Sequence, residues 1–160
     1  MGEQLKQRLR QDTFTSGYQE AILSVLVCAD RLTRSMDATC EVHGITSAQY
    51  NVLRILRGVY PDGHPRCEII TRMIHTAPDV TRLIDRIEKL ELVERAKSVH
   101  DGRLSVTYIT MKGLDLLETL QAEIEALELQ LSAVLTTQEA TALTELCERV
   151  ALSADSSQLD

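Results

Sequence analysis

Hydrophobic residues recur at steps of three and four positions over much of the chain, which is the spacing of one face of an α-helix. Residues 16–42 show this pattern most continuously, and Ser16 with Gln19 has the spacing of a capping box at a helix start. We therefore predict one long helix over 16–42. Its stretch 21–29 is apolar nearly all round, which is typical of a helix segment buried on every side.

The next segments predict shorter helices. Gly44 ends the first helix, and Thr46 with Gln49 repeats the capping-box spacing before a helix over 47–58. The run 60–65 contains Pro, Asp and Gly and predicts a turn. A short helix over about 66–74 follows it.

A fourth helix is predicted over about 78–90, because Pro78 suits the first helical turn and Asp79 is favourable at the positive end of a helix. It carries a regular apolar stripe: Val80, Leu83, Ile84, Ile87 and Leu90. The period then changes to two. Segments 92–97 and 103–109 predict two strands, joined by a turn at 100–102, so a β-hairpin directly follows this helix.

After residue 110 the apolar positions follow the three-and-four spacing of a coiled-coil seam: Leu117, Leu120, Ile124, Leu127, Leu131 and Val134. Such a seam needs a partner helix. A core shared between two subunits is the favoured interpretation, and packing within one subunit is the alternative. Thr136 and Glu139 have capping-box spacing and predict a last helix to about residue 151.

Charge is distributed unevenly along the chain, whose formal net charge is −7. Residues 1–112 hold 16 Lys and Arg against 14 Asp and Glu, whereas residues 113–160 hold 1 against 10. The acidity therefore belongs to the C-terminal part, and charges separated by more than a Debye length of about 8–10 Å are largely screened. A nucleic-acid partner for the first part remains compatible with the acidic total.

Composition narrows the class of protein. The chain has neither the apolar run of a membrane span nor that of a secretory signal, so a cytoplasmic protein is expected. The four cysteines lack C-x-x-C spacing and are expected to be reduced and mostly buried. The histidines show no metal-ligand spacing, and no nucleophile and base pattern or glycine-rich phosphate loop occurs. We expect no enzyme, no cofactor and no metal.

Four motifs, in order, carry a family resemblance: ITSAQYNVLRIL at 45–56, VTRLIDRIEKLELVER at 80–95, DGR at 101–103 and ITMKG at 109–113. The chain resembles the MarR family of bacterial winged helix-turn-helix transcription regulators. The resemblance implies a mainly α fold with a small β-hairpin wing. It divides the chain into an N-terminal dimerisation helix (1–45), a winged helix-turn-helix DNA-binding lobe (46–112) and acidic C-terminal dimerisation helices (113–160), all in one continuous structural unit.

The resemblance also implies roles for residues. A homodimer would present two recognition helices and two wings to a pseudo-palindromic DNA operator. Thr81 and Arg82 match the T-R pair of the family's recognition helix, and Arg86 lies one turn further along. Asp101 and Arg103 match the wing motif, in which the arginine enters the minor groove and the aspartate holds it. A narrow A·T minor groove attracts arginine because its negative potential is enhanced.

Some positions leave alternatives open. Asp79 either contacts DNA or only caps its helix. Arg86 either contacts a phosphate or pairs with an acid such as Asp85. At position 91 the family usually has glycine. Either Glu91 takes a left-handed cap, which would cost about 1–2 kcal/mol, or the helix runs on slightly and the angle between helix and wing changes.

The resemblance implies a small aromatic or phenolic effector that releases a repressor from DNA. Candidate lining residues are Tyr18, Ile22, Met36 and Tyr50. Two rival functions remain. One is an oxidant-sensing regulator that uses Cys40 or Cys67, with Cys28 expected to be buried and inert. The other is a winged-helix module that binds another protein rather than DNA.

Overall fold

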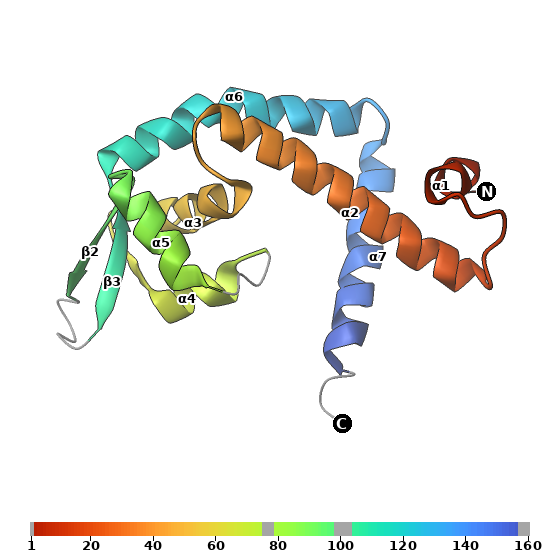
Figure 1. Cartoon of the computed structure of the whole chain (residues 1–160), viewed down its shortest axis with the longest axis horizontal. Helices are drawn as coiled ribbons and strands as arrows, with labels where there is room; N and C mark the ends of the chain where they lie inside the picture. Colours follow the sequence, from red (N-terminus) through yellow and green to blue (C-terminus); the bar gives the residue numbers. More distant parts are fainter. Residues whose placement is uncertain (1, 75–78, 98–103, 157–160) are drawn as a thin grey trace. The chain divides into compact units, whose positions relative to one another are not determined.

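The computed structural model describes residues 2–74, 79–97 and 104–156. The chain divides into two compact units, Met1–Leu120 and Gln121–Asp160. Helices dominate both units (Figure 1). The elements are α1 (Glu3–Leu9), α2 (Gly17–Val42), α3 (Ser47–Arg57), β1 (His64–Pro65), α4 (Arg66–Arg72), α5 (Val80–Lys89), β2 (Val93–Lys97), β3 (Ser105–Ile109), α6 (Met111–Ser132) and α7 (Thr137–Ser156).

The first unit contains a winged helix-turn-helix domain made of α3, α4, α5 and a small antiparallel sheet. The sheet has three strands in the order β1-β3-β2. Val93 pairs with Ile109 and Arg95 with Thr107 in the wing hairpin, while His64 of β1 pairs with Thr107 from the other side. The mainly α fold with a small β wing that the sequence predicted is confirmed.

Two elements were missed by the sequence reasoning. Strand β1 was predicted as part of a turn, because two residues are too short to show an alternating pattern. Gly63 precedes it and approaches β3 so closely that a Cβ there would lie 2.3 Å from the carbonyl oxygen of Thr107. Helix α1 has only one buried side chain, that of Leu5, and so offers no periodic apolar stripe to detect.

Apolar side chains from the end of α2, from α3, α4, α5, the wing and the start of α6 form the core of the first unit. Its largest fully buried side chains are Leu53, Leu56, Ile69, Ile87, Leu117, Leu120, Val52, Val93 and Cys40. Helix α6 begins against the wing. A Cβ at Gly113 would lie 2.3 Å from the carbonyl oxygen of Leu92, so glycine is required there. The core therefore fixes the wing and the recognition helix α5 on one scaffold.

Helix α2 has the predicted caps but not the predicted burial. Ser16 accepts a hydrogen bond from the backbone N–H of Gln19 at 3.2 Å, and Gly44 ends the helix at φ 75°. The side chains of Ile22 and Leu26 are 59% and 60% exposed. The expectation that 21–29 is buried on every side is therefore wrong for the single chain, because in the part of the chain that the structure describes these apolar side chains of α2 remain exposed.

The second unit holds the end of α6 and α7. The capping box at its turn is confirmed, since Thr136 and Glu139 exchange backbone and side-chain hydrogen bonds of 2.8 Å and 3.3 Å. Leu131 and Val134, the last two seam positions, are exposed, as are Leu146 and Val150 of α7.

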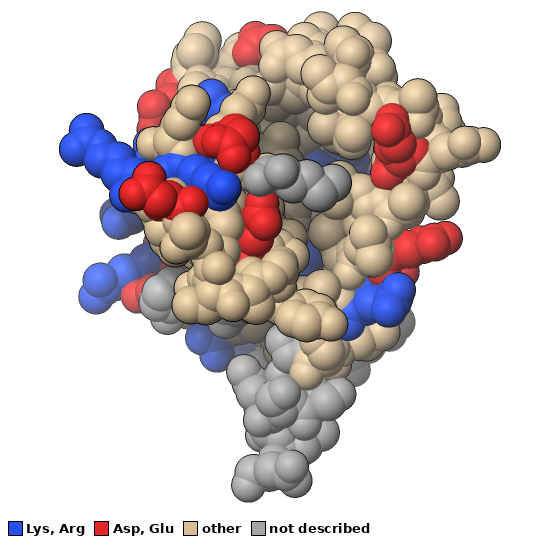
Figure 2. Space-filling view, turned by 90° about the vertical axis from the view of Figure 1, so that its right-hand side faces the viewer, with Lys and Arg blue, Asp and Glu red and all other residues tan. Residues whose placement is uncertain are grey.

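Uncharged residues cover most of the face of the chain drawn in Figure 2, with acidic and basic side chains scattered across it.

The residues of the predicted coiled-coil seam therefore differ in burial along its length. Leu117 and Leu120 are buried in the first unit, as the single-subunit interpretation requires. Leu131 and Val134 are left without cover, as the shared-core interpretation requires. None of the described helices combines the length and hydrophobicity needed to span a lipid bilayer.

Candidate nucleic-acid interface

Asp79 caps the exposed helix α5 and also holds Arg82. The carboxylate accepts a hydrogen bond from the backbone N–H of Arg82 at 3.0 Å, and its other oxygen lies 2.9 Å from Arg82 Nε. Arg82 is nevertheless 79% exposed, so its guanidinium remains accessible at the first turn of the helix. The capping role considered for Asp79 is present, and the same carboxylate limits the rotamers of Arg82.

Thr81 lies beside Arg82 at the start of α5 and contacts a residue that sequence reasoning did not select. Arg66, the first residue of α4, donates a hydrogen bond from Nη1 to Thr81 Oγ1 at 3.0 Å. Both side chains are exposed. Arg66 lies 15 positions before Thr81 in the sequence, so no local pattern connects the two. The contact between α4 and α5 places Arg66 beside the recognition helix, where it extends the basic surface.

Arg86 is exposed one turn further along α5. Asp85, the acid considered as its structural partner, instead forms an ion pair with Arg95 of β2. Within the described ranges no ion pair involves Arg86. Thr81, Arg82 and Arg86 thus share the exposed side of a helix whose opposite side, with Val80, Ile84 and Ile87, is buried.

Arg95 joins the wing to the recognition helix and was also missed from sequence. Its guanidinium contacts Asp85 and lies 2.6 Å from Glu88 through Nη2 and 3.0 Å through Nε. Hydrogen bonds to Glu88 and Asp85 raise the pKa of Arg95 above its usual value. The two acids lie three positions apart on α5, which places them on one helix face, but nothing in the sequence pairs them with a strand.

Glu91 forms the left-handed cap, the first of the two alternatives considered for the end of α5. It takes the left-handed conformation, with φ 61°, directly after the helix cap Leu90. The Leu92 N–H bonds to the Ile87 carbonyl at 3.0 Å and the Glu91 N–H to Glu88 at 2.8 Å, which is a Schellman motif. The helix therefore ends where the family's glycine would end it, despite the side chain.

The side chain of Glu91 turns to the start of α6. Its carboxylate lies 2.9 Å from Lys112 Nζ, and this hydrogen bond lowers the pKa of Glu91. The Glu91 carbonyl accepts a hydrogen bond from Thr110 Oγ1 at 2.8 Å. These contacts hold the corner between recognition helix, wing and α6 in one geometry. Asp101 and Arg103, the predicted wing-tip pair, lie outside the described residues.

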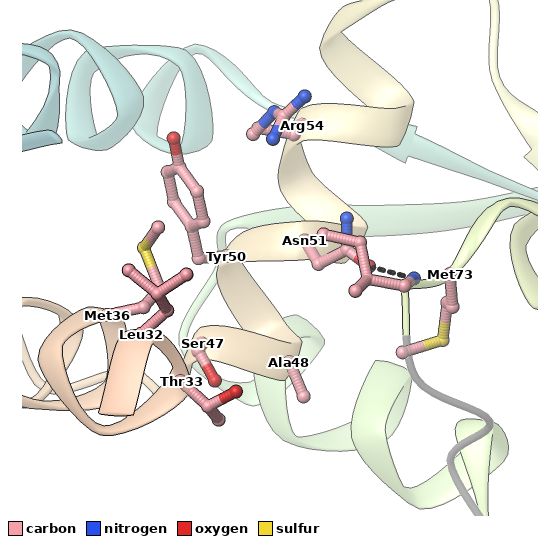
Figure 3. A pocket seen from close by; sticks show the side chains of 10 residues that line it. Leu32, Thr33, Met36, Ser47, Ala48, Tyr50, Asn51, Arg54 and Met73 are labelled. Carbon is pink, nitrogen blue, oxygen red and sulfur yellow. Dashed lines mark hydrogen bonds between the residues drawn. The ribbon is translucent and has the colours of Figure 1, made fainter. Parts of the chain in front are cut away.

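A pocket of about 190 Å³ lies between α2, α3 and the segment that follows α4 (Figure 3). Met36 and Tyr50, two of the predicted effector-binding residues, line it together with Leu32, Met73 and Arg54. Tyr18 and Ile22, the other two, lie outside the lining and are 86% and 59% exposed. The lining is mostly apolar, with Arg54 as its only charged residue among those described.

Asn51 also lines this pocket and fixes its wall. The side chain is buried, and its Oδ1 accepts a hydrogen bond from the backbone N–H of Ile74 at 2.9 Å, the dashed line in Figure 3. Sequence reasoning missed Asn51 because one polar residue inside an otherwise apolar helix face gives no indication of its partner.

The cysteines differ from the expectation of mostly buried thiols. Cys40 is fully buried, whereas Cys28, Cys67 and Cys147 are exposed in the single chain. The expectation that Cys28 is buried is wrong for the same reason as for its neighbours on α2. Within the described ranges, no group of three or more His, Cys, Asp or Glu residues is placed to hold a metal ion.

An exposed recognition helix, a wing and a basic first turn together define a winged helix-turn-helix DNA-binding protein. No family model matches the chain. A crystallised MarR transcription factor from Planctomyces limnophilus is 33% identical, with a TM-score of 0.64, over 88% of this chain and 99% of that one. This chain belongs to the MarR family of transcription regulators.

Two further relatives bear on regulation. The homoprotocatechuate degradative operon repressor of Escherichia coli is 29% identical over 74% of this chain and 78% of its own length. The PcaV transcriptional regulator of Streptomyces coelicolor, crystallised with its natural ligand, is 25% identical, with a TM-score of 0.67, over 79% of this chain and 91% of that one.

Proposed function

We propose that this protein is a homodimeric repressor that binds a pseudo-palindromic DNA operator and leaves it when a small aromatic or phenolic effector binds. The observation that carries DNA binding is the exposed face of α5, where Thr81, Arg82 and Arg86 lie over a buried apolar face. A helix supported in this way fits the major groove, whose base edges arginine recognises. Asp101 and Arg103 remain the proposed wing contacts.

The homodimer is proposed from the uncovered apolar side chains. Ile22, Val25 and Leu26 are exposed on α2, and Leu146 and Val150 on α7. Isolated exposed apolar residues are ordinary on protein surfaces, but repeated ones on one helix indicate an interface. A second copy of the chain is the occupant we propose, because a two-fold dimer presents two recognition helices about 34–36 Å apart. Light scattering at micromolar concentration tests this, and a monomer would contradict it.

The effector is proposed to bind in the pocket of Figure 3. A volume of about 190 Å³ suits one substituted ring, since an apolar cavity of about 150 Å³ accommodates benzene. Met36 and Tyr50 supply apolar surface, and Arg54 supplies a charge for a carboxylate. The relatives support control by a small molecule, because one is a repressor of a homoprotocatechuate degradative operon and the other was crystallised with its natural ligand.

Calorimetry with homoprotocatechuate tests the effector site. Arg54→Met should weaken binding about tenfold, since an ion pair with the ligand is worth about 1.4 kcal/mol or more. Arg57→Met is the matched control, because Arg57 is exposed on the same helix outside the pocket. Equal losses in both variants, or no binding of hydroxylated aromatic acids at all, would contradict the site.

An oxidant-sensing mode is the second candidate. Cys67 is exposed on α4 next to Arg66, whereas Cys40 is buried and therefore shielded from oxidants. If oxidation releases the protein from DNA, Cys67→Ser should remain bound in peroxide.

Salt dependence distinguishes DNA binding from a protein-interaction role. For DNA, the logarithm of the affinity falls linearly with the logarithm of the salt concentration, with a slope of about 0.9 for each phosphate neutralised. As a regulator of transcription the protein would act in the cytoplasm and catalyse no reaction.

A further inference from the structure

The turn between α4 and the recognition helix is held by a side chain of a third helix. Helix α4 ends at Arg72, and Met73 continues in extended conformation with φ −72° and ψ 139°. The next N–H, that of Ile74, donates to Asn51 Oδ1 of α3 at 2.9 Å. Asn51 is only 9% exposed, whereas Ile74 is 70% exposed, so this bond anchors an otherwise open segment to the core.

The same bond lies in the wall of the pocket. Asn51, Met73 and Ile74 all line the cavity. Figure 3 shows Asn51 and Met73 across the cavity from Leu32 and Met36 of α2. Asn51 is the amide side chain of that lining, and its carbonyl oxygen is a hydrogen-bond acceptor of the kind that binds a ring hydroxyl. A ring hydroxyl that donated to the same oxygen would therefore share the acceptor of the Ile74 N–H and weaken that bond.

The anchored residue also precedes the DNA-binding surface directly. Ile74 lies five positions before Asp79, which caps α5 and pairs with Arg82. A change in the course of the chain at Ile74 would therefore act within five positions of Asp79 and close to the first turn of α5, where Thr81 and Arg82 lie. Ligand binding shifts such an equilibrium only through contacts that differ between the two states, and this hydrogen bond is one such contact.

We propose that Asn51 is a positioning residue that couples the pocket to the recognition helix. In the free protein its carbonyl holds Ile74 and the start of α5 in the DNA-binding geometry. A phenolic effector takes that acceptor by donating its hydroxyl hydrogen bond, and the turn is released. This rests on the proposed function, in which the pocket is the effector site and α5 enters the major groove.

A set of variants isolates the acceptor. Asn51→Leu has similar size and no acceptor, Asn51→Asp keeps an acceptor oxygen at the same position, and Thr33→Val removes a hydroxyl elsewhere in the same lining. Each is compared with the parent protein for affinity toward a duplex that the parent enriches from random DNA. Hydrogen exchange at the Ile74 amide is measured on the same samples without any effector.

Asn51→Leu should bind the duplex about tenfold more weakly, with faster exchange at Ile74, while Asn51→Asp and Thr33→Val stay near the parent. Homoprotocatechuate should then weaken DNA binding of the parent but add little in Asn51→Leu, because the coupling between two sites is reciprocal and passes through the missing bond. The proposal would be overturned if Asn51→Leu bound the duplex with the affinity of the parent protein, or if Asn51→Asp lost as much DNA affinity as Asn51→Leu.

The measurements also separate this proposal from the proposed function. If homoprotocatechuate fails to bind the parent protein, the effector assignment fails, while the comparison without effector still decides the role of Asn51. If Asn51→Leu does not fold, hydrogen exchange at the Ile74 amide of the parent protein decides whether the pocket is coupled to this turn. Saturating homoprotocatechuate should accelerate exchange at Ile74, and unchanged or slower exchange there would overturn the coupling.

Discussion

Arg95 Nη2 lies 2.6 Å from Glu88 Oε2, which joins the wing strand β2 to the recognition helix α5. Arg95 also contacts Asp85 one turn earlier on the same helix. The guanidinium is partly buried, with 30% of its side chain exposed, and both acids are more exposed. This connection adds a direct side-chain link between wing and helix to the core and the Glu91 corner that hold them.

Replacing Arg95 by Met should affect both stability and DNA binding. Loss of a partly exposed ion-pair network should lower the free energy of unfolding by about 1 kcal/mol. DNA affinity should fall as well, because helix and wing no longer keep one spacing. Urea unfolding and fluorescence anisotropy measure the two effects. Arg86→Met is the control, with weaker DNA binding and unchanged stability, and a stability loss as large as that of Arg95→Met would contradict this division.

Arg82→Ala should weaken operator binding by about 1–3 kcal/mol and relax the preference for one base pair. The reason is that a base contact carries sequence information, whereas a phosphate contact does not. Competition among single-base operator variants measures the effect. Asp79→Asn, which keeps a capping oxygen but removes the ion pair, should leave the base preference in place. A uniform loss over all sequences in Arg82→Ala would make Arg82 a phosphate contact instead.

Glu91→Gly should raise the free energy of unfolding by about 1 kcal/mol, because a left-handed residue with a Cβ is strained by about 1–2 kcal/mol. The gain is reduced by the larger conformational entropy of glycine in the unfolded chain. Glu91→Ala keeps the strain and, like Glu91→Gly, loses the contact with Lys112, so it serves as the control. Thermal unfolding with equal midpoints for Gly and Ala would show that the left-handed cap stores no strain.

Stability should fall in mild acid because of His64. Burial lowers its pKa below the usual 6.5, Arg72 lowers it further, and Glu68 opposes both. Its Nε2 has no hydrogen-bond partner among the described residues. The unfolded chain therefore takes up a proton at a higher pH than the folded one, so stability is lost as pH falls below 6.5 toward the lowered pKa.

Urea titrations at several pH values test this assignment. His64→Gln should remove the part of the pH dependence that lies in this window, since glutamine does not titrate. A variant that retains the full slope between pH 7 and pH 5 would assign it to other groups, such as the carboxylates that titrate lower.

Local signals in the sequence predicted most of the helices. Thr46 and Thr136 carry capping boxes that form as their spacing indicates, and the period-two run before Ile109 forms a strand. These features depend on neighbours within a few positions. The contacts of Arg95 with Glu88, of Arg66 with Thr81 and of Asn51 with Ile74 join residues 7 to 23 positions apart, and no local pattern contains them.

Burial was predicted less well than secondary structure. The apolar run on α2 is a sound helix signal, but the same pattern arises whether the face is covered by the chain itself or by another molecule. Leu26 is exposed in the single chain although its neighbours are apolar. The sequence left the conformation of Glu91 open because propensity disfavours a left-handed glutamate, whereas the Schellman hydrogen bonds and Lys112 stabilise it.

Selection of bound sequences from random DNA tests whether two copies of this chain read one operator with paired recognition helices. We expect an enriched inverted repeat whose half-sites lie one helical turn, about 10–10.5 base pairs, apart from centre to centre. Substituting Arg82 should change the preferred base symmetrically in both halves. Enrichment of a single unrepeated site, or of no sequence at all, would contradict it.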